Sequence, residues 1–217
     1  MRGRLMKLAA TELLTPDNFV LALIDHQPQM FFGVQSADRQ MIINNVTGLA
    51  KAAKVFGVPT VLTTVAAKEF SGPLIPQIQA VFPNQVPINR STMNSWEDKH
   101  FVAAIEKTKR KKIVMAGLWT EVCLAFPAIS AVEAGYQVYA VVDASAASSI
   151  EAHTAAIERM KQVGVIPVTW LQVLCELQRD WARKETYPAV MKVINEHAGA
   201  YGLGVFYAET MIGSHSG

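Results

Sequence analysis

One stretch, Phe19-Val-Leu-Ala-Leu-Ile24, determines which class of fold the chain can adopt, and it runs directly into Asp25-His-Gln27. An apolar run that is continuous rather than alternating predicts a strand buried on both faces, as in a parallel sheet covered by helices on each side. The carboxyl ends of such strands form the edge where open parallel sheets bind their ligands. We therefore expect a central strand here, with functional residues directly after it.

Similar apolar runs alternate with helical patterns along most of the chain. Strands are expected over 58–65, 113–118, 137–142 and 165–170, with a short extended piece ending at Arg90. Helices are expected over 38–56, 96–107, 121–134, 148–163 and 171–196, the last interrupted by Pro188. Ser95 with Asp98 and Ser148 with Glu151 are capping boxes that start two of them. This alternation predicts a three-layer, doubly wound, Rossmann-like α/β fold with mostly parallel strands in the order 3-2-1-4-5-6 and helices on both faces.

We expect a single domain over 1–217, because no change in composition marks a linker. The C-terminal tail, 198–217, is glycine-rich but carries large apolar side chains, namely Tyr201, Leu203, Val205, Phe206, Tyr207 and Met211. A disordered tail seldom has so much apolar surface. The tail is therefore expected to dock on another subunit of a homo-oligomer.

Composition excludes several classes of protein. The chain is 51% hydrophobic and 18% charged, which is unlike a disordered or fibrous chain. Its longest apolar runs, 19–24 and 113–119, fall far short of the ~18 residues of a membrane span, so no membrane association is expected. The basic cluster 107–112 fits the last turn of a helix better than a nucleic-acid site. Two cysteines form no disulfide framework, so a cytoplasmic location is expected.

Three residues at strand ends have the chemistry of a nucleophilic site. Cys123 lies in the first turn of a predicted helix, where the helix dipole lowers a thiol pKa and free N–H groups can hold an oxyanion. Asp25 is a candidate general base with a raised pKa, and Arg90 is a permanent cation that can keep Asp25 ionised. Each also has a structural interpretation, as a packed thiol, a turn residue and a surface cation. The catalytic interpretation requires all three to meet.

The other candidates favour structural roles. His26 points away from Asp25 by strand alternation. The remaining histidines have no metal-ligand spacing, namely His100, His153, His197 and His215. Cys175 lies mid-helix among leucines and is expected in the core or in an interface. Neither G-x-G-x-x-G nor a P-loop occurs, which disfavours a nucleotide, and no cofactor is expected.

Several longer segments resemble a known family. Leu23-Ile-Asp-His-Gln27, Arg90 and Gly117-Leu-Trp-Thr-Glu-Val-Cys-Leu-Ala-Phe-Pro127 are similar to segments of the isochorismatase-like cysteine hydrolases, and Asn94-Ser-Trp-Glu-Asp98 and Val142-Asp-Ala-Ser145 to segments of its YcaC-like branch. The resemblance implies a catalytic triad of Asp25, Arg90 and Cys123. Most relatives have lysine where this chain has Arg90. Because arginine does not lose its proton in a protein, only an electrostatic or orienting role is left for Arg90.

The resemblance also implies the surroundings of the nucleophile. A cis peptide bond is expected between Leu118 and Trp119, with the backbone N–H groups of Trp119 and Cys123 as oxyanion donors. The substrate pocket is expected to include Gln27, Phe31, Trp119, Thr120 and Phe126. No metal is expected, because segment 63–70, where the nicotinamidase branch has its ligands, contains neither His nor Asp. YcaC-like relatives form octamers, which implies the same for this chain.

Within the family that the chain resembles, the presence of Cys123 implies hydrolysis of a C–N, amide-type bond in a small molecule, through a thioester and with Asp25 as the base. Three alternatives remain open. One is a scaffold of the same fold that binds small molecules with little or no turnover. The second is a vinyl ether hydrolase of the isochorismatase type, and the third is a flavodoxin-like nucleotide-binding protein.

Overall fold

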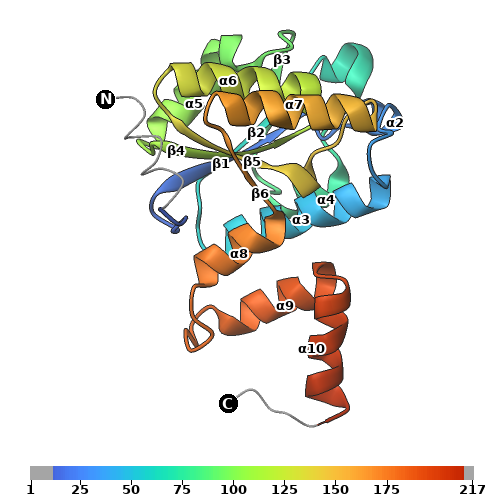
Figure 1. The fold of residues 1–217 in the computed structure, drawn as a ribbon, viewed down its shortest axis with the longest axis vertical. Helices are drawn as coiled ribbons and strands as arrows, with labels where there is room; N and C mark the ends of the chain where they lie inside the picture. Colours follow the sequence, from blue (N-terminus) through green and yellow to red (C-terminus); the bar gives the residue numbers. More distant parts are fainter. Residues whose placement is uncertain (1–11, 213–217) are drawn as a thin grey trace.

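A six-stranded parallel sheet forms the centre of the part of the chain that the computed structural model describes, residues 12–212 (Figure 1). The strands are β1 (Phe19–Ile24), β2 (Thr60–Val65), β3 (Ile88–Arg90), β4 (Lys112–Gly117), β5 (Gln137–Val141) and β6 (Ile166–Val168). Their order is β3-β2-β1-β4-β5-β6, and every neighbouring pair is parallel. The predicted doubly wound fold and strand order are confirmed.

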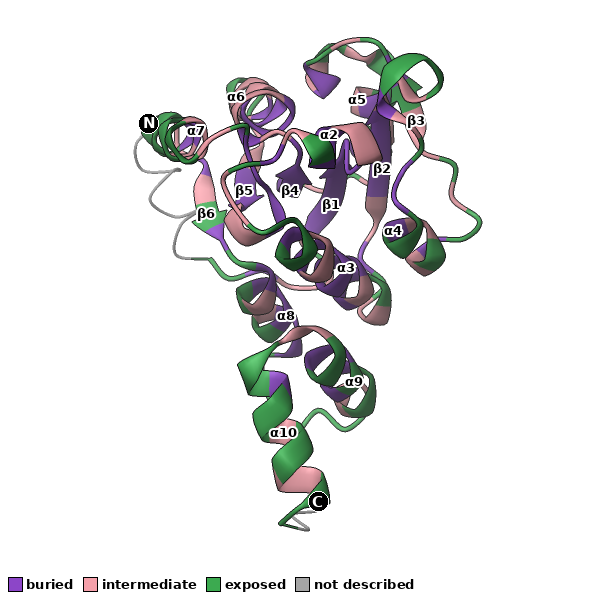
Figure 2. Cartoon of the chain, turned by 90° about the vertical axis from the view of Figure 1, so that its right-hand side faces the viewer, coloured by how far each residue is buried: buried purple, intermediate pink, exposed green. Residues whose placement is uncertain are grey.

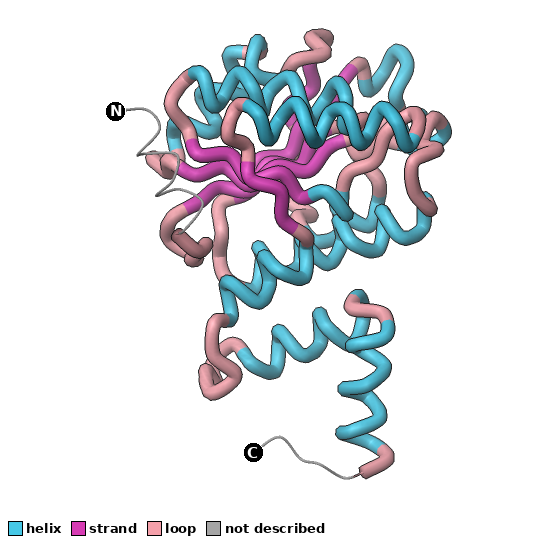
Figure 3. The backbone as a smooth tube through the Cα atoms, viewed as in Figure 1, coloured by secondary structure: helices cyan, strands magenta, loops and turns pink. Residues whose placement is uncertain are grey.

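Helices cover both faces of this sheet (Figure 3). One face packs against α3 (Arg39–Val55), α4 (Pro76–Val81) and α8 (Trp170–Gln178), and the other against α5 (Lys99–Lys107), α6 (Ala125–Glu133) and α7 (Ile150–Gln162). Leu21 and Leu23 of β1 enter the first of these two cores, whereas Ala22 and Ile24 enter the second. All residues of β1 are buried, as its continuous apolar run predicts.

Capping chemistry moves two helix starts from their predicted positions. α5 begins after Asp98, whose carboxylate accepts two backbone N–H bonds, and Asn94 caps the preceding 3₁₀ turn, η2 (Ser95–Glu97). The predicted cap, Ser95, lies inside that turn. α7 begins after Ser149, whose hydroxyl accepts from the N–H of Ala152, and not after Ser148. Both predictions found the helix but chose a neighbouring polar residue as its cap.

The C-terminal third departs most from the sequence prediction. The helix expected over 171–196 is two helices, α8 and α9 (Tyr187–His197), with the break at 179–186. Arg179 ends α8 with a positive φ of 60°. Pro188 lies in the first turn of α9, where its missing N–H costs no helical hydrogen bond. The proline therefore helps to start a helix and does not interrupt one.

Most of the described tail forms α10 (Ala200–Thr210), which extends away from the sheet in Figures 1 and 2. It packs against α9, and at Gly202 an added Cβ would lie 2.5 Å from the backbone oxygen of Ile194, so the glycine allows this close contact. Large apolar side chains of the tail are exposed, namely Tyr201, Leu203, Phe206, Tyr207 and Met211. Residues 213–217 of the predicted tail lie outside the described residues. Among residues 12–212, no helix combines the length and hydropathy needed to cross a bilayer.

Candidate active site

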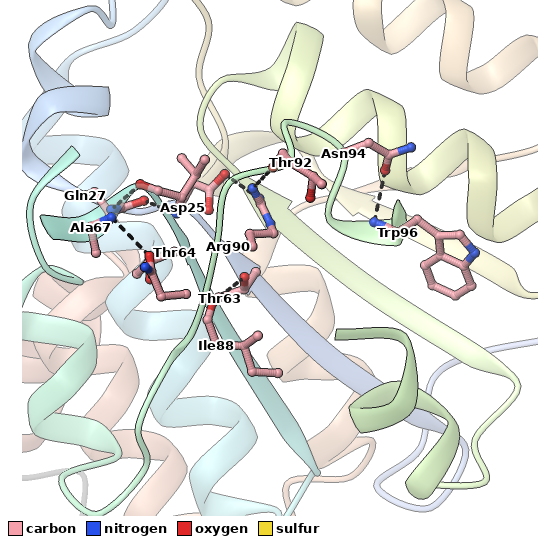
Figure 4. A network of polar contacts seen from close by, with 12 residues as sticks. Asp25, Gln27, Thr63, Thr64, Ala67, Ile88, Arg90, Thr92, Asn94 and Trp96 are labelled. Atoms are coloured by element: carbon pink, nitrogen blue, oxygen red, sulfur yellow. Dashed lines mark hydrogen bonds and ion pairs between the residues drawn. The ribbon is translucent and has the colours of Figure 1, made fainter. Parts of the chain in front are cut away.

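Three strand ends bring Asp25, Arg90 and Cys123 to one edge of the sheet. Asp25 follows β1, Arg90 ends β3, and Cys123 lies in η3 (Thr120–Leu124), a π-helical turn after β4. β1 lies between β2 and β4, and β3 pairs with β2 through Arg90 and Val65. Figure 4 shows the guanidinium of Arg90 directed at the carboxylate of Asp25. The candidate triad is therefore assembled from segments that are far apart in the sequence.

Asp25 is a strained and fully buried acid. Its φ of 59° is in the left-handed region that side chains other than glycine seldom adopt, and such strain occurs often at functional sites. Its Oδ2 accepts a hydrogen bond of 2.6 Å from Nη2 of Arg90. Desolvation raises the pKa of Asp25 to about 6, against the lowering effects of the Arg90 charge and of contacts with Cys123 and Arg90. The carboxylate is therefore mostly ionised at neutral pH, yet poorly solvated.

Arg90 is fixed on both sides. One end of its guanidinium pairs with Asp25, and Nη1 donates to the backbone oxygen of Thr92. The side chains of the Arg90–Asp25 pair are both inaccessible to solvent. A cation held in this way neutralises the buried carboxylate and fixes its orientation, which is the role that the sequence left open for arginine.

Cys123 does not have the lowered pKa predicted from its place in the chain. Burial raises the pKa of its thiol well above the usual range, and the charge of Asp25 raises it further. Arg90 and the backbone N–H of Trp119 act in the opposite direction but are weaker. The turn is π-helical rather than α-helical, and Thr120 is its first residue. At neutral pH the site therefore holds a neutral thiol beside a carboxylate.

Trp119 forms one wall of this turn. The Leu118–Trp119 peptide bond, which the family resemblance singles out, is cis. A backbone contact with Trp119 lowers the pKa of the Cys123 thiol, against the larger effects of burial and of Asp25. The indole Nε1 donates to the backbone oxygen of Met30 at 2.8 Å, and an added Cβ at Gly33 would lie 2.3 Å from the ring. The indole is therefore held tightly against α2 (Pro28–Phe32).

The predicted pocket residues have different surroundings. Phe31 is almost completely buried, Phe126 is half-buried, and Thr120 is fully buried with its Oγ1 2.9 Å from Nδ1 of His153. Their roles toward a substrate stay predictions.

Gln27 has a structural role in addition to its predicted place in the pocket, which stays a prediction. Its side-chain amide donates to the backbone oxygens of Val65 (3.1 Å) and Gly72 (2.6 Å) and accepts from the N–H of Val65 (2.9 Å). The side chain is fully buried, and its polar atoms bond to the backbone. Gln27 holds the end of β2 in place beside Asp25.

His26 has the structural role that strand alternation predicts. Its Nε2 lies 3.0 Å from the backbone oxygen of Ala144, and desolvation lowers its pKa to about 4, so the ring is neutral. Within residues 12–212, no cluster of three or more His, Cys, Asp or Glu side chains has an arrangement that would hold a metal ion. Cys175, expected in the core or an interface, is exposed on α8.

Sequence reasoning missed the segment that holds the Cys123 turn from outside, 144–153. It contributes backbone and side-chain contacts to Gly117, Thr120 and Glu121. His153 was considered only as a metal ligand. The capping pattern at 148–151 marks the start of the helix that carries it, but not what the helix faces.

Comparison with known proteins agrees with this geometry. The isochorismatase domain model matches residues 19–172. The chain belongs to the isochorismatase family. It is 39% identical to YcaC of Escherichia coli over 169 residues, which cover 77% of this chain and 81% of YcaC.

Two solved YcaC structures have the same fold as this isochorismatase-family chain. The Pseudomonas aeruginosa protein, solved with hexane-2,5-diol and covalent acrylamide, matches with a TM-score of 0.88 and 33% identity over 92% of this chain and 98% of its own. The E. coli protein, an octameric hydrolase of unknown specificity, matches with a TM-score of 0.87 and 36% identity over 92% of this chain and 97% of its own.

Proposed function

We propose that this chain is a cysteine hydrolase that cleaves a C–N, amide-type bond of a small molecule through a thioester on Cys123. One observation carries the proposal: a buried carboxylate, Asp25, lies between a guanidinium at 2.6 Å and a thiol, and has a pKa of about 6. A base is most effective when its pKa lies near the working pH. The hydrolase character of YcaC supports the same reaction class.

The first half of the proposed cycle forms the thioester. Asp25 takes the proton from the thiol of Cys123 as the sulfur attacks the carbonyl carbon of the amide. The N–H groups of Trp119 and Cys123 stabilise the oxyanion. The C–N bond then breaks, and the amine leaves with the proton that Asp25 holds.

In the second half, Asp25 takes a proton from water as the water oxygen attacks the thioester. The C–S bond breaks, the acid product leaves, and the sulfur recovers its proton from Asp25. Throughout the cycle Arg90 keeps its charge and holds Asp25 in position. Because the resting thiol is neutral, this mechanism needs proton transfer during attack and not a standing thiolate.

Intact-chain mass spectrometry with a panel of small amides and hydroxamates tests the proposal. We expect a mass increase equal to the acyl group on Cys123, and no such increase in Cys123→Ala or Asp25→Asn. Cys175→Ala is the matched control, because it removes the exposed cysteine and leaves the buried one. Full amide turnover by Cys123→Ala would refute the mechanism.

A second candidate, a small-molecule-binding scaffold with weak or no turnover, is favoured by one observation. Burial raises the pKa of the Cys123 thiol, which slows any reaction that needs the free thiolate. Acrylamide modification separates the two functions, since acrylamide reacts with thiolates and P. aeruginosa YcaC holds it covalently. Fast modification of Cys123 at neutral pH supports the enzyme, and modification no faster than that of an ordinary thiol supports the scaffold.

We also propose that the chain acts as a homo-oligomer, as the octameric E. coli YcaC does, and that α10 lies in an interface. The exposed side chains of Leu203 and Phe206 on α10 support this, because a helix with so much exposed apolar surface is normally covered. Native mass spectrometry should show a smaller assembly for Phe206→Glu. Val86→Glu, at an exposed apolar residue of a distant loop, is the control and should leave the mass of the assembly unchanged.

A further inference from the structure

One segment of the chain, 144–153, which follows β5, makes a series of contacts with the turn that carries Cys123. The hydroxyl of Ser145 accepts from the N–H of Gly117 at 3.0 Å, at the start of the turn. The backbone oxygen of Ala146 accepts from the N–H of Thr120 at 2.9 Å. Farther along, Ser148 donates its N–H (3.1 Å) and its hydroxyl (2.6 Å) to Oε1 of Glu121. These contacts hold the end of β4 and the first two residues of the turn, Thr120 and Glu121.

His153 adds the contact that reaches the inside of the turn. Its Nδ1 lies 2.9 Å from Oγ1 of Thr120, a residue that is fully buried. His153 lies in the first turn of α7, which packs directly against η3. Burial lowers the pKa of His153 more than the facing charge of Glu121 raises it, so the imidazole is neutral at pH 7. In a neutral ring whose proton is on Nε2, Nδ1 accepts a hydrogen bond from the threonine hydroxyl.

Thr120 is well placed to transmit this contact to the reacting groups. It directly follows Trp119 and is the first residue of the π-helical turn that contains Cys123. A shift of about 1 Å in a reacting group can reduce a rate about 100-fold. We propose that His153 is a positioning residue, which holds the nucleophile and its N–H donors in register through Thr120. The effect on turnover rests on the proposed hydrolase function, whereas the effect on Cys123 reactivity does not.

The contacting atom makes the test specific. In asparagine the side-chain amide lies close to the position of histidine Nδ1, whereas in glutamine it extends beyond it. We expect His153→Ala to slow acrylamide modification of Cys123 about tenfold, the scale of one lost hydrogen bond of about 1.4 kcal/mol. His153→Asn should recover most of that rate, and His153→Gln should recover less. In His100→Ala, which changes an exposed histidine of α5, acrylamide should modify Cys123 at the wild-type rate.

Thr120→Val tests the same contact from the other side, because it removes the hydroxyl and keeps the shape. It should slow modification as much as His153→Ala does, and the double variant should be no slower than either single one, since the two residues act as a pair. With any amide that is turned over, kcat should fall by the same factor while KM changes less than twofold.

The outcomes separate this inference from the proposed function. If modification slows as described but no amide is hydrolysed, the positioning role stands and the hydrolase proposal fails. If His153→Ala and Thr120→Val are modified at the wild-type rate, or if His153→Asn is no faster than His153→Ala, the positioning role is refuted whatever the turnover.

Discussion

Replacing Arg90 with methionine tests the charge arrangement most directly, because it removes the guanidinium and keeps much of the side-chain length. The pKa of Asp25 is about 6 because desolvation raises it more than Arg90 lowers it. A neighbouring opposite charge lowers a carboxyl pKa by about 1–3 units. Without the guanidinium we therefore expect the pKa of Asp25 to rise from about 6 to about 7–9.

The loss of activity follows from the fraction of Asp25 that is ionised, since the ionised form is the base in the proposed mechanism. At pH 7 this fraction is about 0.9 for a pKa of about 6, about 0.5 for a pKa of 7 and about 0.01 for a pKa of 9. Arg90→Met should thus lose about twofold to 100-fold at pH 7 and recover as the pH rises. The rising limb of the pH profile moves to higher pH, and its direction does not change.

The assay is the rate of acrylamide modification of Cys123, and of turnover where a substrate is known, measured from pH 5 to pH 9.5 on protein shown to be folded by circular dichroism. Arg90→Lys is the matched control, because it keeps a cation beside Asp25 and should move the midpoint less. If the midpoint of Arg90→Met stays near that of the wild type, or if both variants move equally, the charge argument is wrong.

Three further predictions concern stability and packing. The pKa of Asp25 is raised from 3.8 to about 6, so between pH 4 and pH 6 this group lowers the free energy of unfolding as the pH rises. The pKa of His26 is lowered from 6.5 to about 4, so over the same range this group increases the free energy of unfolding. Each effect is on the order of 3 kcal/mol. Asp25→Asn removes the first slope, so in urea titrations its stability should rise with pH more steeply than that of the wild type; parallel curves would contradict this. Gly33→Ala should destabilise the protein by about 1–3 kcal/mol and change tryptophan fluorescence, because its Cβ would lie 2.3 Å from the Trp119 ring. Gly202→Val should detach α10 from α9 and speed proteolysis near residue 199. The control for both glycine variants is Gly204→Ala, where an added Cβ meets nothing within 4 Å. Wild-type behaviour of Gly33→Ala or Gly202→Val would show that the Trp119 ring or the α9 backbone shifts at little cost in free energy.

The sequence predicts those parts of the fold that depend on burial alone. β1 has the predicted bounds residue for residue. A strand that is apolar at every position must be covered on both faces, as a central strand between two helical layers is. The meeting of Asp25 and Arg90 follows from topology, since the ends of parallel strands share an edge. What topology cannot give is the environment of each group, which is why the direction of the Cys123 pKa shift was predicted wrongly.

The features that were missed depend on long-range hydrogen bonds. The partners of Gln27 lie 38 and 45 residues along the chain, so no local pattern indicates that its amide is already used. Thr120 and His153 are separated by 33 residues and a whole strand. The π-helical form of η3 also leaves no signature, because its residues suit an α-helix equally well. Chemistry at a strand end was predictable, but the supporting contacts required the structure.

The order of elements along the chain has a consequence for how such proteins diversify. Asp25, Arg90, Cys123 and the supporting segment 144–153 all precede α8, and α10 is attached to the rest of the molecule chiefly through α9. Changes in α10 can therefore accumulate without disturbing a reacting atom. Under the proposal that α10 lies in an interface, assembly and chemistry can evolve separately in proteins of this plan, and exchanging α10 between homologues is a direct way to alter the assembly.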